Sequence, residues 1–196
     1  RGVVEGADKS HRWIIDPLDG TTNFLHSIPL FAISIGLERE GELVAGVLYN
    51  PVFDELYTAE KGKGAFLNDR RRLRVAGRRE LSECVIATGI PHRGRPQHEI
   101  FRKELHVLMD NTAGIRRTGS AAIDLAWTAA GRFDAFWERN LEPWDTAAGI
   151  VLVREAGGMV SDLDGADNML FGGQIAAANS QIHKALLPTL KSAANI

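Results

Sequence analysis

The segment from Asp16 to Asn23, Asp-Pro-Leu-Asp-Gly-Thr-Thr-Asn, constrains the fold more tightly than any other part of the chain. It follows directly on the apolar run at residues 13–15, which predicts a short buried strand. Pro17 fixes its own φ and keeps Asp16 extended, while Gly20 permits a sharp turn. The sequence therefore predicts a strand that ends in a tight polar turn with two carboxylates three residues apart.

Asp16 and Asp19 can converge on one hard cation at the end of this strand. Mg²⁺ prefers oxygen ligands and keeps several waters, so a few carboxylates and a substrate phosphate are enough to hold it. The Leu18 carbonyl can supply a further oxygen. The N–H groups and hydroxyls from Gly20 to Thr22 suit an anion if a helical turn follows. By itself, such a string favours the simpler interpretation of a turn with Asx capping.

Strands dominate the first part of the chain. Alternating residue size at 31–38 predicts a strand with one packed face, and a turn at 40–42 leads into another strand at 43–49. Strands at 56–59 and 65–67 flank Lys-Gly-Lys-Gly at 61–64, which indicates a hairpin. We therefore expect a mostly antiparallel sheet in this part of the chain.

Helices and strands alternate further along. Ser120 can cap a helix that runs to Ala130, and Pro143 can start a helix that ends before the glycines at 157 and 158. Ser180 opens a final helix. The remaining elements are a helix at 98–111 and strands at 84–88, 133–137, 159–163 and 175–178. The fold class is mixed α/β in layers, and we expect one domain over residues 1–196, with an antiparallel-sheet part at roughly 1–110 and a smaller α/β part at 111–196.

A second polar constellation lies at residues 142–149, Glu-Pro-Trp-Asp-Thr-Ala-Ala-Gly. Pro143 would place Asp145 in the first turn of a helix. The small residues at 147–149 would let that helix approach another element closely. Alone, Asp145 is simply an acidic residue favoured by the helix dipole.

Composition excludes several function classes. The formal net charge is −2, which provides no electrostatic footprint for nucleic acid or an anionic membrane. The arginines at 70–72, 74, 78 and 79 favour a solvated hairpin face, with nucleic-acid binding as the minor alternative because no aromatic residues lie between them. The histidines, His92, His98 and His106 among them, suggest solvated or packing roles and no metal cluster. The single Cys84 rules out an intramolecular disulfide, looks inert and fits a reducing compartment, so we expect a cytoplasmic protein.

The two constellations together resemble the inositol monophosphatase family of Mg²⁺-dependent, lithium-sensitive phosphatases. The resemblance rests on residues 13–24 and 143–149, and continues to Glu-Ala-Gly-Gly at 155–158. Between them, Gly-Ser-Ala-Ala at 119–122 and Phe-Trp-Glu at 136–138 fall where the family has its substrate contacts. The similarity covers nearly the whole chain, in order. It implies an αβαβα sandwich of the inositol monophosphatase and fructose-1,6-bisphosphatase type, and a homodimer, in which Arg116 and Arg117 could serve the interface.

The resemblance also implies residue roles. Two or three Mg²⁺ ions would be held at each site, and Li⁺ would inhibit. Thr21 would orient the metal-bound water, which makes it catalytic together with Asp19. The implied metal ligands are Asp16, the Leu18 carbonyl, Asp19 and Asp145. The implied substrate-binding residues are Leu18, Asp19, Gly20 and Thr21 for the phosphate, Gly119, Ser120 and Ala121 for the substrate, and Glu138 and Asp145 for its hydroxyls.

The chain departs from the family at its N-terminus. The family has an acidic pair upstream of its first aspartate, and the glutamate of that pair binds metal. Here this position would lie before residue 1, and Glu5 and Asp8 match no ligand position, so we interpret both as surface turn residues. By the same resemblance, we expect the two helices that precede this strand in the family to be missing as well. We therefore expect the N-terminal segment of the domain to be missing, and these 196 residues alone to be weakly active or inactive.

The resemblance favours myo-inositol monophosphate as substrate and leaves two alternatives. A related phosphatase could act on histidinol phosphate, fructose 1,6-bisphosphate or a 3′-phosphonucleotide. A non-catalytic regulatory member would need none of the aspartates, so the full set argues against that alternative. We expect a small phosphorylated polyol as the substrate, with neither nucleic acid nor membrane as a partner.

Overall fold

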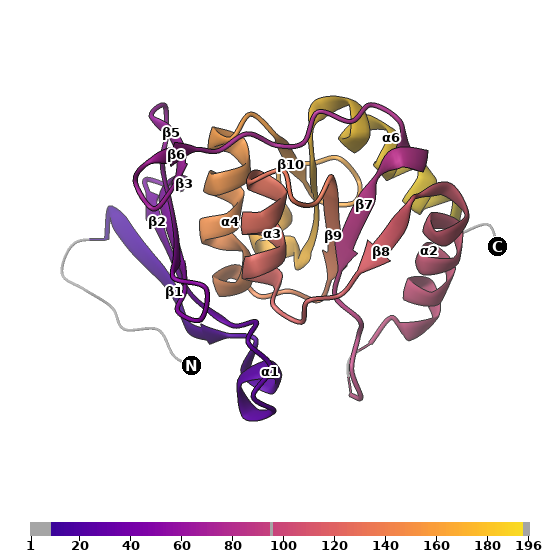
Figure 1. Ribbon diagram of the computed structural model, residues 1–196, viewed down its shortest axis with the longest axis horizontal. Helices are drawn as coiled ribbons and strands as arrows, with labels where there is room; N and C mark the ends of the chain where they lie inside the picture. The colour runs from indigo at the N-terminus through magenta and orange to yellow at the C-terminus, as the bar shows by residue number, and fades with distance from the viewer. Residues whose placement is uncertain (1–8, 95, 194–196) are drawn as a thin grey trace.

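Two β-sheets enclose a pair of helices, and a further pair covers the outer face of the second sheet (Figure 1). The computed structural model describes residues 9–94 and 96–193. The predicted surface turn at Glu5 and Asp8 lies outside this range. Among the described residues the layers run sheet, helices, sheet, helices, which confirms the predicted layered α/β fold class.

The first sheet is antiparallel throughout, as the sequence predicts. Its strands lie in chain order, each beside the next. They are β1 (His11–Asp19), β2 (Ala32–Arg39), β3 (Glu42–Asn50), β4 (Glu55–Glu60), β5 (Gly64–Leu67) and β6 (Arg71–Arg72). The Lys-Gly-Lys-Gly turn joins β4 to β5, which confirms the hairpin.

The second sheet is mixed and has the order β10-β11-β9-β7-β8. Its strands are β7 (Val85–Thr88), β8 (Gly114–Arg116), β9 (Ala135–Arg139), β10 (Met159–Ser161) and β11 (Gln174–Ala178). β7 runs parallel to both β8 and β9. The first strand of this sheet along the chain, β7, comes before residue 111. β7 and the helix that follows it therefore pack with the later elements of the chain and not with the first sheet.

Most of the helices lie close to their predicted positions, although no helix is predicted at residues 169–172. They are α1 (Thr21–Leu25), α2 (His98–Asn111), α3 (Ala121–Ala129), α4 (Pro143–Glu155), α5 (Met169–Gly172) and α6 (Ser180–Ser192), with a 3₁₀ turn at Leu81–Glu83. Ser120 caps α3 by accepting a hydrogen bond from the Ile123 N–H, and Pro143 occupies the first turn of α4. Both predicted helix starts are therefore confirmed.

Small residues bring α4 onto the first sheet. Gly36 on β2 pairs with Gly46 on β3, and α4 lies against both. A Cβ at Gly36 would lie 2.6 Å from that of Ala147, and one at Gly46 would lie 2.6 Å from the Ala148 carbonyl oxygen. The close approach predicted for residues 147–149 is therefore present, and it sets the depth at which α4 enters the sheet.

The second sheet buries both of its faces. On β9, Phe136 packs toward the layer of α3 and α4, while Ala135 and Trp137 pack toward α2 and α6. Because side chains alternate along a strand, Glu138 then lies on the same face as Phe136 and Arg139 on the opposite one. This alternation directs one charged residue into the space between the sheets and its neighbour toward α2.

The strand at residues 13–15 is only half buried, which corrects the sequence prediction. Ile14 faces α4 with 7% of its surface exposed, whereas Trp13 and Ile15 are 63% and 51% exposed. The physical reason is that helices of the described residues cover only one face of the first sheet (Figure 1). An apolar run on a sheet with one covered face alternates in burial instead of being buried throughout.

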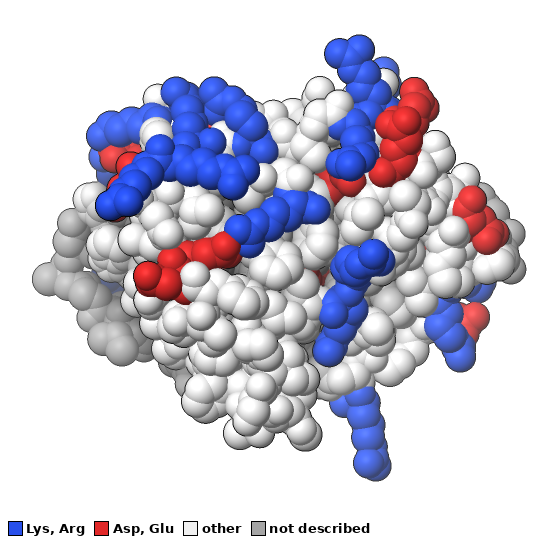
Figure 2. Space-filling model, viewed as in Figure 1, with Lys and Arg blue, Asp and Glu red and all other residues white. Residues whose placement is uncertain are grey.

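The arginine cluster lies on the surface, as the sequence predicts. Lysine and arginine side chains gather over β5 and β6, at the upper left of Figure 2. The arginines at positions 70–72 and 74 are exposed there, and Arg78 forms an ion pair with Asp134 at 3.0 Å. Cys84 is buried, and burial raises the pKa of its thiol to about 12. Among the described residues, no helix has the length and apolar character needed to span a membrane.

Candidate active site

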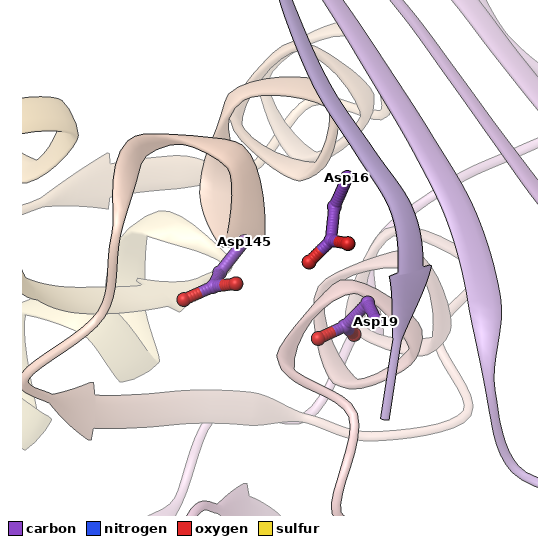
Figure 3. Close-up of side chains that lie close together, drawn as sticks. All are labelled: Asp16, Asp19 and Asp145. Atoms are coloured by element: carbon purple, nitrogen blue, oxygen red, sulfur yellow. The ribbon is translucent and has the colours of Figure 1, made fainter. Parts of the chain in front are cut away.

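Three aspartates from two elements meet between the first sheet and α4. Asp16 and Asp19 come from β1, and Asp145 comes from the first turn of α4. One carboxylate oxygen from each lies within 4.8 Å of the others, and the three carboxylates turn toward one space (Figure 3). The two constellations that the sequence analysis singled out therefore form one acidic triad.

An irregularity in β1 places two of these aspartates on one side of the sheet. In a regular strand, residues three apart point to opposite faces. Here Asp16 pairs with Ser34 and Asp19 pairs with Ala32, so the register shifts between them. Such a bulge bends the strand and redirects side chains. Both carboxylates consequently become buried, with 4% and 8% of their surface exposed.

Asp145 is held by the start of its own helix. Its Oδ2 accepts a hydrogen bond from the Glu142 N–H at 2.8 Å, and the Glu142 side chain completes a capping box with the N–H of residue 145. A capping box satisfies two N–H groups at the helix N-terminus and fixes the side chains that form it. The helix start therefore orients the Asp145 carboxylate.

Asp19 is tied to the start of α3. Its Oδ2 accepts hydrogen bonds from the Ser120 hydroxyl and from the Ala122 N–H, the latter at 2.9 Å. Burial raises the pKa of Asp19 to about 7, the two hydrogen bonds partly offset this effect, and the negative charges of Asp145 and Asp16 add to it. A carboxyl group in this position is stabilised in its charged form by a nearby cation.

The turn after β1 has the form that the sequence predicts. Gly20 adopts φ +83°, and the helical turn α1 begins at the next residue. A side chain at Gly20 would also bring a Cβ within 2.8 Å of the Leu30 carbonyl oxygen. Both the positive φ and the lack of space therefore favour glycine at this position. The Thr21 hydroxyl donates a hydrogen bond to the Leu18 carbonyl oxygen at 3.0 Å. This contact holds the threonine side chain beside the triad.

All of the predicted site residues line one cavity of about 200 Å³. They reach it from β1, from the turn after β1, from the start of α3, from the end of β9 and from the start of α4. The ten residues are Asp16, Leu18, Asp19, Gly20, Thr21, Gly119, Ser120, Ala121, Glu138 and Asp145. The structure thus brings the whole predicted set together.

The cavity also has walls that the sequence analysis did not assign. The loop after β7, from Gly89 to His92, lines one side, although His92 is predicted to be a solvated or packing residue. Arg117 and Asp124 line another. Burial raises the pKa of Asp124 well above its usual range. Its sequence signal was a single acidic residue within the otherwise apolar run from 121 to 127.

Gly89 and Glu138 both line this cavity and are in close contact with each other. A Cβ at Gly89 would lie 1.9 Å from Oε1 of Glu138, so the absence of a side chain makes room for the carboxylate. The parallel pairing of β7 with β9 brings the two residues together, since Thr88 lies opposite Trp137. The loop after β7 therefore helps to position a predicted substrate contact.

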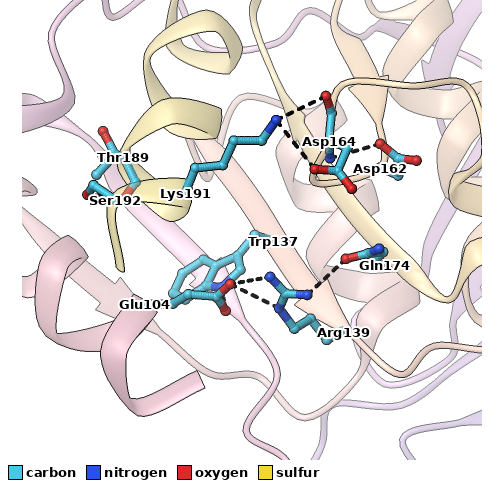
Figure 4. Close-up of polar contacts among 9 residues, drawn as sticks. All are labelled: Glu104, Trp137, Arg139, Asp162, Asp164, Gln174, Thr189, Lys191 and Ser192. Carbon is cyan, nitrogen blue, oxygen red and sulfur yellow. Dashed lines mark hydrogen bonds and ion pairs between the residues drawn. The ribbon is translucent and has the colours of Figure 1, made fainter. Parts of the chain in front are cut away.

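A buried polar network backs the end of β9. The Arg139 guanidinium donates from Nε to Oε1 of Glu104 at 2.9 Å and from Nη1 to Oε1 of Gln174 at 2.9 Å (Figure 4). Glu104 is fully buried on α2, and the Trp137 ring N–H points to its other oxygen. Separating such a buried pair is costly, because it would leave an uncompensated charge in the protein interior. This network anchors the strand end that carries Glu138.

The triad fits a hard divalent cation. All three of its side chains offer carboxylate oxygens, which suit Mg²⁺ better than they suit the softer transition metals. Three carboxylates this close together repel one another, and a bound cation relieves that repulsion. The Leu18 carbonyl lines the same cavity and has a second lone pair available for such an ion.

Comparisons with known proteins agree with this site. A sequence model of the inositol monophosphatase family matches residues 2–195. An inositol-1-monophosphatase from Mesorhizobium japonicum is 61% identical over 191 residues, which are 97% of this chain and 71% of that protein. The Nus factor SuhB of Pseudomonas aeruginosa is 49% identical over 192 residues, which are 97% of this chain and 70% of that protein.

Among solved structures, the extragenic suppressor protein suhB from Bartonella henselae is similar over most of the chain. The match has a TM-score of 0.92 and 57% sequence identity, and it covers 95% of this chain and 71% of that one. Both the fold and the sequence are therefore shared along nearly the full described length.

Proposed function

The chain belongs to the inositol monophosphatase family, and we propose on this basis that it hydrolyses myo-inositol monophosphate to inositol and phosphate with Mg²⁺. Membership of this family indicates a metal-dependent phosphatase that acts on small phosphorylated substrates. The observation that carries the proposal is the acidic triad, whose oxygens approach within 4.8 Å inside the cavity that all predicted substrate contacts line.

Asp16, Asp19, Asp145 and the Leu18 carbonyl are the groups that would hold Mg²⁺. When bound, Mg²⁺ lowers the pKa of a coordinated water and neutralises charge on the phosphate and on the leaving oxygen. The protein contributes the geometry: the bulge in β1 and the capping box of α4 hold the carboxylates before any ion arrives. Phosphoryl transfer depends mainly on such positioning and charge neutralisation.

The turn from Gly20 to Thr22 is the proposed phosphate site. It lies next to Asp19, and its N–H groups belong to the start of a helical turn, where backbone donors suit phosphate oxygens. The Thr21 hydroxyl donates to the Leu18 carbonyl, and its oxygen would accept a hydrogen bond from an attacking water and so orient it. These groups hold the reacting phosphorus at one end of the cavity.

The other end of the cavity suits the alcohol part of the ester. Gly119 and Ala121 flank Ser120, and these three residues line the cavity together with Glu138. A carboxylate accepts hydrogen bonds from hydroxyl groups, which a polyol provides in number. On the other face of β9, the neighbouring Arg139 is bonded to Glu104, which ties the strand end that carries Glu138 to α2.

A regulatory role is the second candidate. The relative from Pseudomonas aeruginosa carries the name of a Nus factor, and it is 49% identical to this chain over 192 residues, against 61% over 191 residues for the phosphatase from Mesorhizobium japonicum. The intact triad favours the catalytic proposal, because a purely regulatory protein needs no buried cluster of three carboxylates.

A panel of phosphate esters assayed on the full-length protein tests the proposal. It contains myo-inositol 1-phosphate, histidinol phosphate, fructose 1,6-bisphosphate and a 3′-phosphonucleotide, each with Mg²⁺ and with or without Li⁺. We expect the highest kcat/KM for the inositol ester. The Asp16→Asn variant serves as a control for contaminating phosphatases and should lose the activity.

The possible outcomes separate the candidates. Hydrolysis of none of the esters would overturn the enzymatic proposal and favour the regulatory role. A preference for histidinol phosphate, the bisphosphate or the nucleotide would overturn only the choice of substrate. Inhibition by Li⁺, the homodimer and the cytoplasmic location stay predictions.

A further inference from the structure

Asn23 connects two parts of the site by hydrogen bonds, although it is not one of the predicted substrate-binding residues. It belongs to α1, the helical turn that follows Gly20, and only 2% of its surface is exposed. Its Nδ2 donates to the Leu30 carbonyl oxygen at 2.7 Å and to the Thr118 carbonyl oxygen at 2.9 Å. One amide nitrogen therefore joins three segments of the chain.

The orientation of this amide is determined by its surroundings. Both neighbours of Nδ2 are carbonyl oxygens, which only accept hydrogen bonds, so the nitrogen and not the oxygen must face them. An aspartate at position 23 would place a carboxylate oxygen against two carbonyl oxygens. Position 23 thus requires a hydrogen-bond donor, and aspartate, although it has nearly the same shape as asparagine, would be strongly unfavourable there.

The two segments that Asn23 joins have different tasks in the proposed function. α1 continues from the turn at Gly20–Thr22, which holds the phosphate. The Thr118 carbonyl comes directly before Gly119–Ala121, which face the alcohol part of the substrate. Asn23 and Thr118 are 95 positions apart in sequence, and the hydrogen bond between them is buried.

Gly119 packs directly against the Asn23 amide. A Cβ at Gly119 would lie 2.9 Å from Nδ2 of Asn23, and Gly119 has φ +87°. The loop therefore packs against the amide so closely that no side chain fits between them. The hydrogen bond from the Ser120 hydroxyl to Asp19 also links these two segments, but Asp19 is itself a candidate metal ligand.

We propose that Asn23 is a positioning residue that sets the distance between the phosphate turn and the segment Gly119–Ala121, and thereby the fit of the alcohol part of the substrate. This inference rests on the proposed function. In it, recognition of the polyol, unlike recognition of the phosphate, depends on the contact between Asn23 and Thr118. The phosphate turn keeps its separate anchor from Thr21 to Leu18.

The Asn23→Asp variant tests this role, with two substrates compared in the full-length protein. For myo-inositol 1-phosphate we expect KM to rise about tenfold with kcat changed much less, since loss of a buried hydrogen bond shifts the loop. For p-nitrophenyl phosphate, whose leaving group has no hydroxyls to bind, KM should change less than about threefold. Asn23→Ala removes the donor without adding repulsion and should give a smaller effect in the same direction.

Asn179→Asp is the matched control. The Asn179 amide likewise donates to two carbonyl oxygens, those of Ala76 and Arg78 at 2.9 and 2.8 Å, but neither residue lines the cavity. This variant should lower the melting temperature and leave both KM values unchanged. If Asn23→Asp does not fold, the comparison between Asn23→Ala and Asn179→Ala decides.

Hydrogen–deuterium exchange provides a readout that does not depend on activity. Exchange in residues 118–122 should be faster in Asn23→Ala than in the wild type, and unchanged in Asn179→Ala. Unchanged exchange, or equal KM effects on both esters, would overturn the inference. If the wild type hydrolyses neither ester while exchange is faster in Asn23→Ala, the proposed function fails and the structural tie stands.

Discussion

The Asp19 carboxylate accepts a hydrogen bond from the hydroxyl of Ser120, a residue 101 positions further along the chain. The same hydroxyl accepts from the Ile123 N–H at 3.3 Å and so caps α3. One small side chain therefore supports a candidate metal ligand and a helix start at once. The acidic triad and the substrate side of the cavity are joined through this contact.

The Ser120→Ala variant should lose both functions of the hydroxyl. Loss of an N-cap costs about 1 kcal/mol of stability, and the Asp19 carboxylate loses one of its two donors. We expect a lower melting temperature and weaker binding of Mn²⁺, used as a probe for the Mg²⁺ site and measured by calorimetry. Ser120→Thr keeps a hydroxyl and should retain most of both. Wild-type Mn²⁺ affinity in Ser120→Ala would contradict a role for this contact in the metal site.

The Asp145→Asn variant should separate metal binding from folding. An asparagine oxygen can still accept the hydrogen bond from the Glu142 N–H, so the start of α4 should be preserved. The loss of one negative ligand should raise the Mg²⁺ concentration for half-maximal activity by about tenfold or more, because Mg²⁺ depends on charged oxygens. The melting temperature without metal should stay close to that of the wild type.

Asp162→Asn is a suitable control for this measurement. Asp162 accepts hydrogen bonds from the N–H groups of Asp164 and Ala166 in a loop away from the cavity. Its replacement should leave the Mg²⁺ dependence unchanged. An unchanged Mg²⁺ dependence in Asp145→Asn as well would refute the ligand role of Asp145.

His183 should make stability depend on pH. Its ring lies buried between α6 and β10, with Nε2 at 2.9 Å from the Ser161 hydroxyl oxygen, and burial lowers its pKa. The unfolded state therefore takes up the proton first as pH falls below about 6.5, and this uptake lowers the free energy of unfolding. The loss from one such group is at most about 1.4 kcal/mol per pH unit.

Urea unfolding of the wild type and of His183→Gln between pH 7.5 and 5.5 measures this effect. The wild type should lose stability over this range more steeply than the variant. His106→Gln is the comparison variant, because that ring is exposed on α2. Parallel pH profiles for the wild type and His183→Gln would show that His183 does not contribute.

Local patterns in the sequence account for most of the helices and for the carboxylate pair at the end of the first strand. Ser120, Pro143 and Ser180 mark helix starts within one residue of the observed ones, because capping depends on neighbouring residues only. Asp16 and Asp19 stand out as two carboxylates three residues apart after a strand, whereas a metal-binding role for Asp145 is implied only by the family resemblance. The resemblance to a known family supplied the order in which these segments meet.

Burial and long-range contacts were less accessible to sequence reasoning. Trp13 and Ile15 look buried in the sequence, yet whether a strand is covered on one face or both depends on elements outside it. The loop from Gly89 to His92 carries no catalytic pattern, and it reaches the cavity only because β7 lies next to β9. The contact of Asn23 with Thr118 likewise depends on the tertiary fold and on no local motif.

The contact between Gly89 and Glu138 yields the last prediction. Gly89→Ala would place a methyl group 1.9 Å from the present position of the Glu138 Oε1 atom, so the carboxylate must move out of its place in the cavity. We expect KM for myo-inositol 1-phosphate to rise several-fold, with that for p-nitrophenyl phosphate nearly unchanged. Gly77→Ala, which adds a methyl group in open space, should change neither. If Gly89→Ala binds the inositol ester as the wild type does, the Glu138 carboxylate is not the group that recognises its hydroxyls.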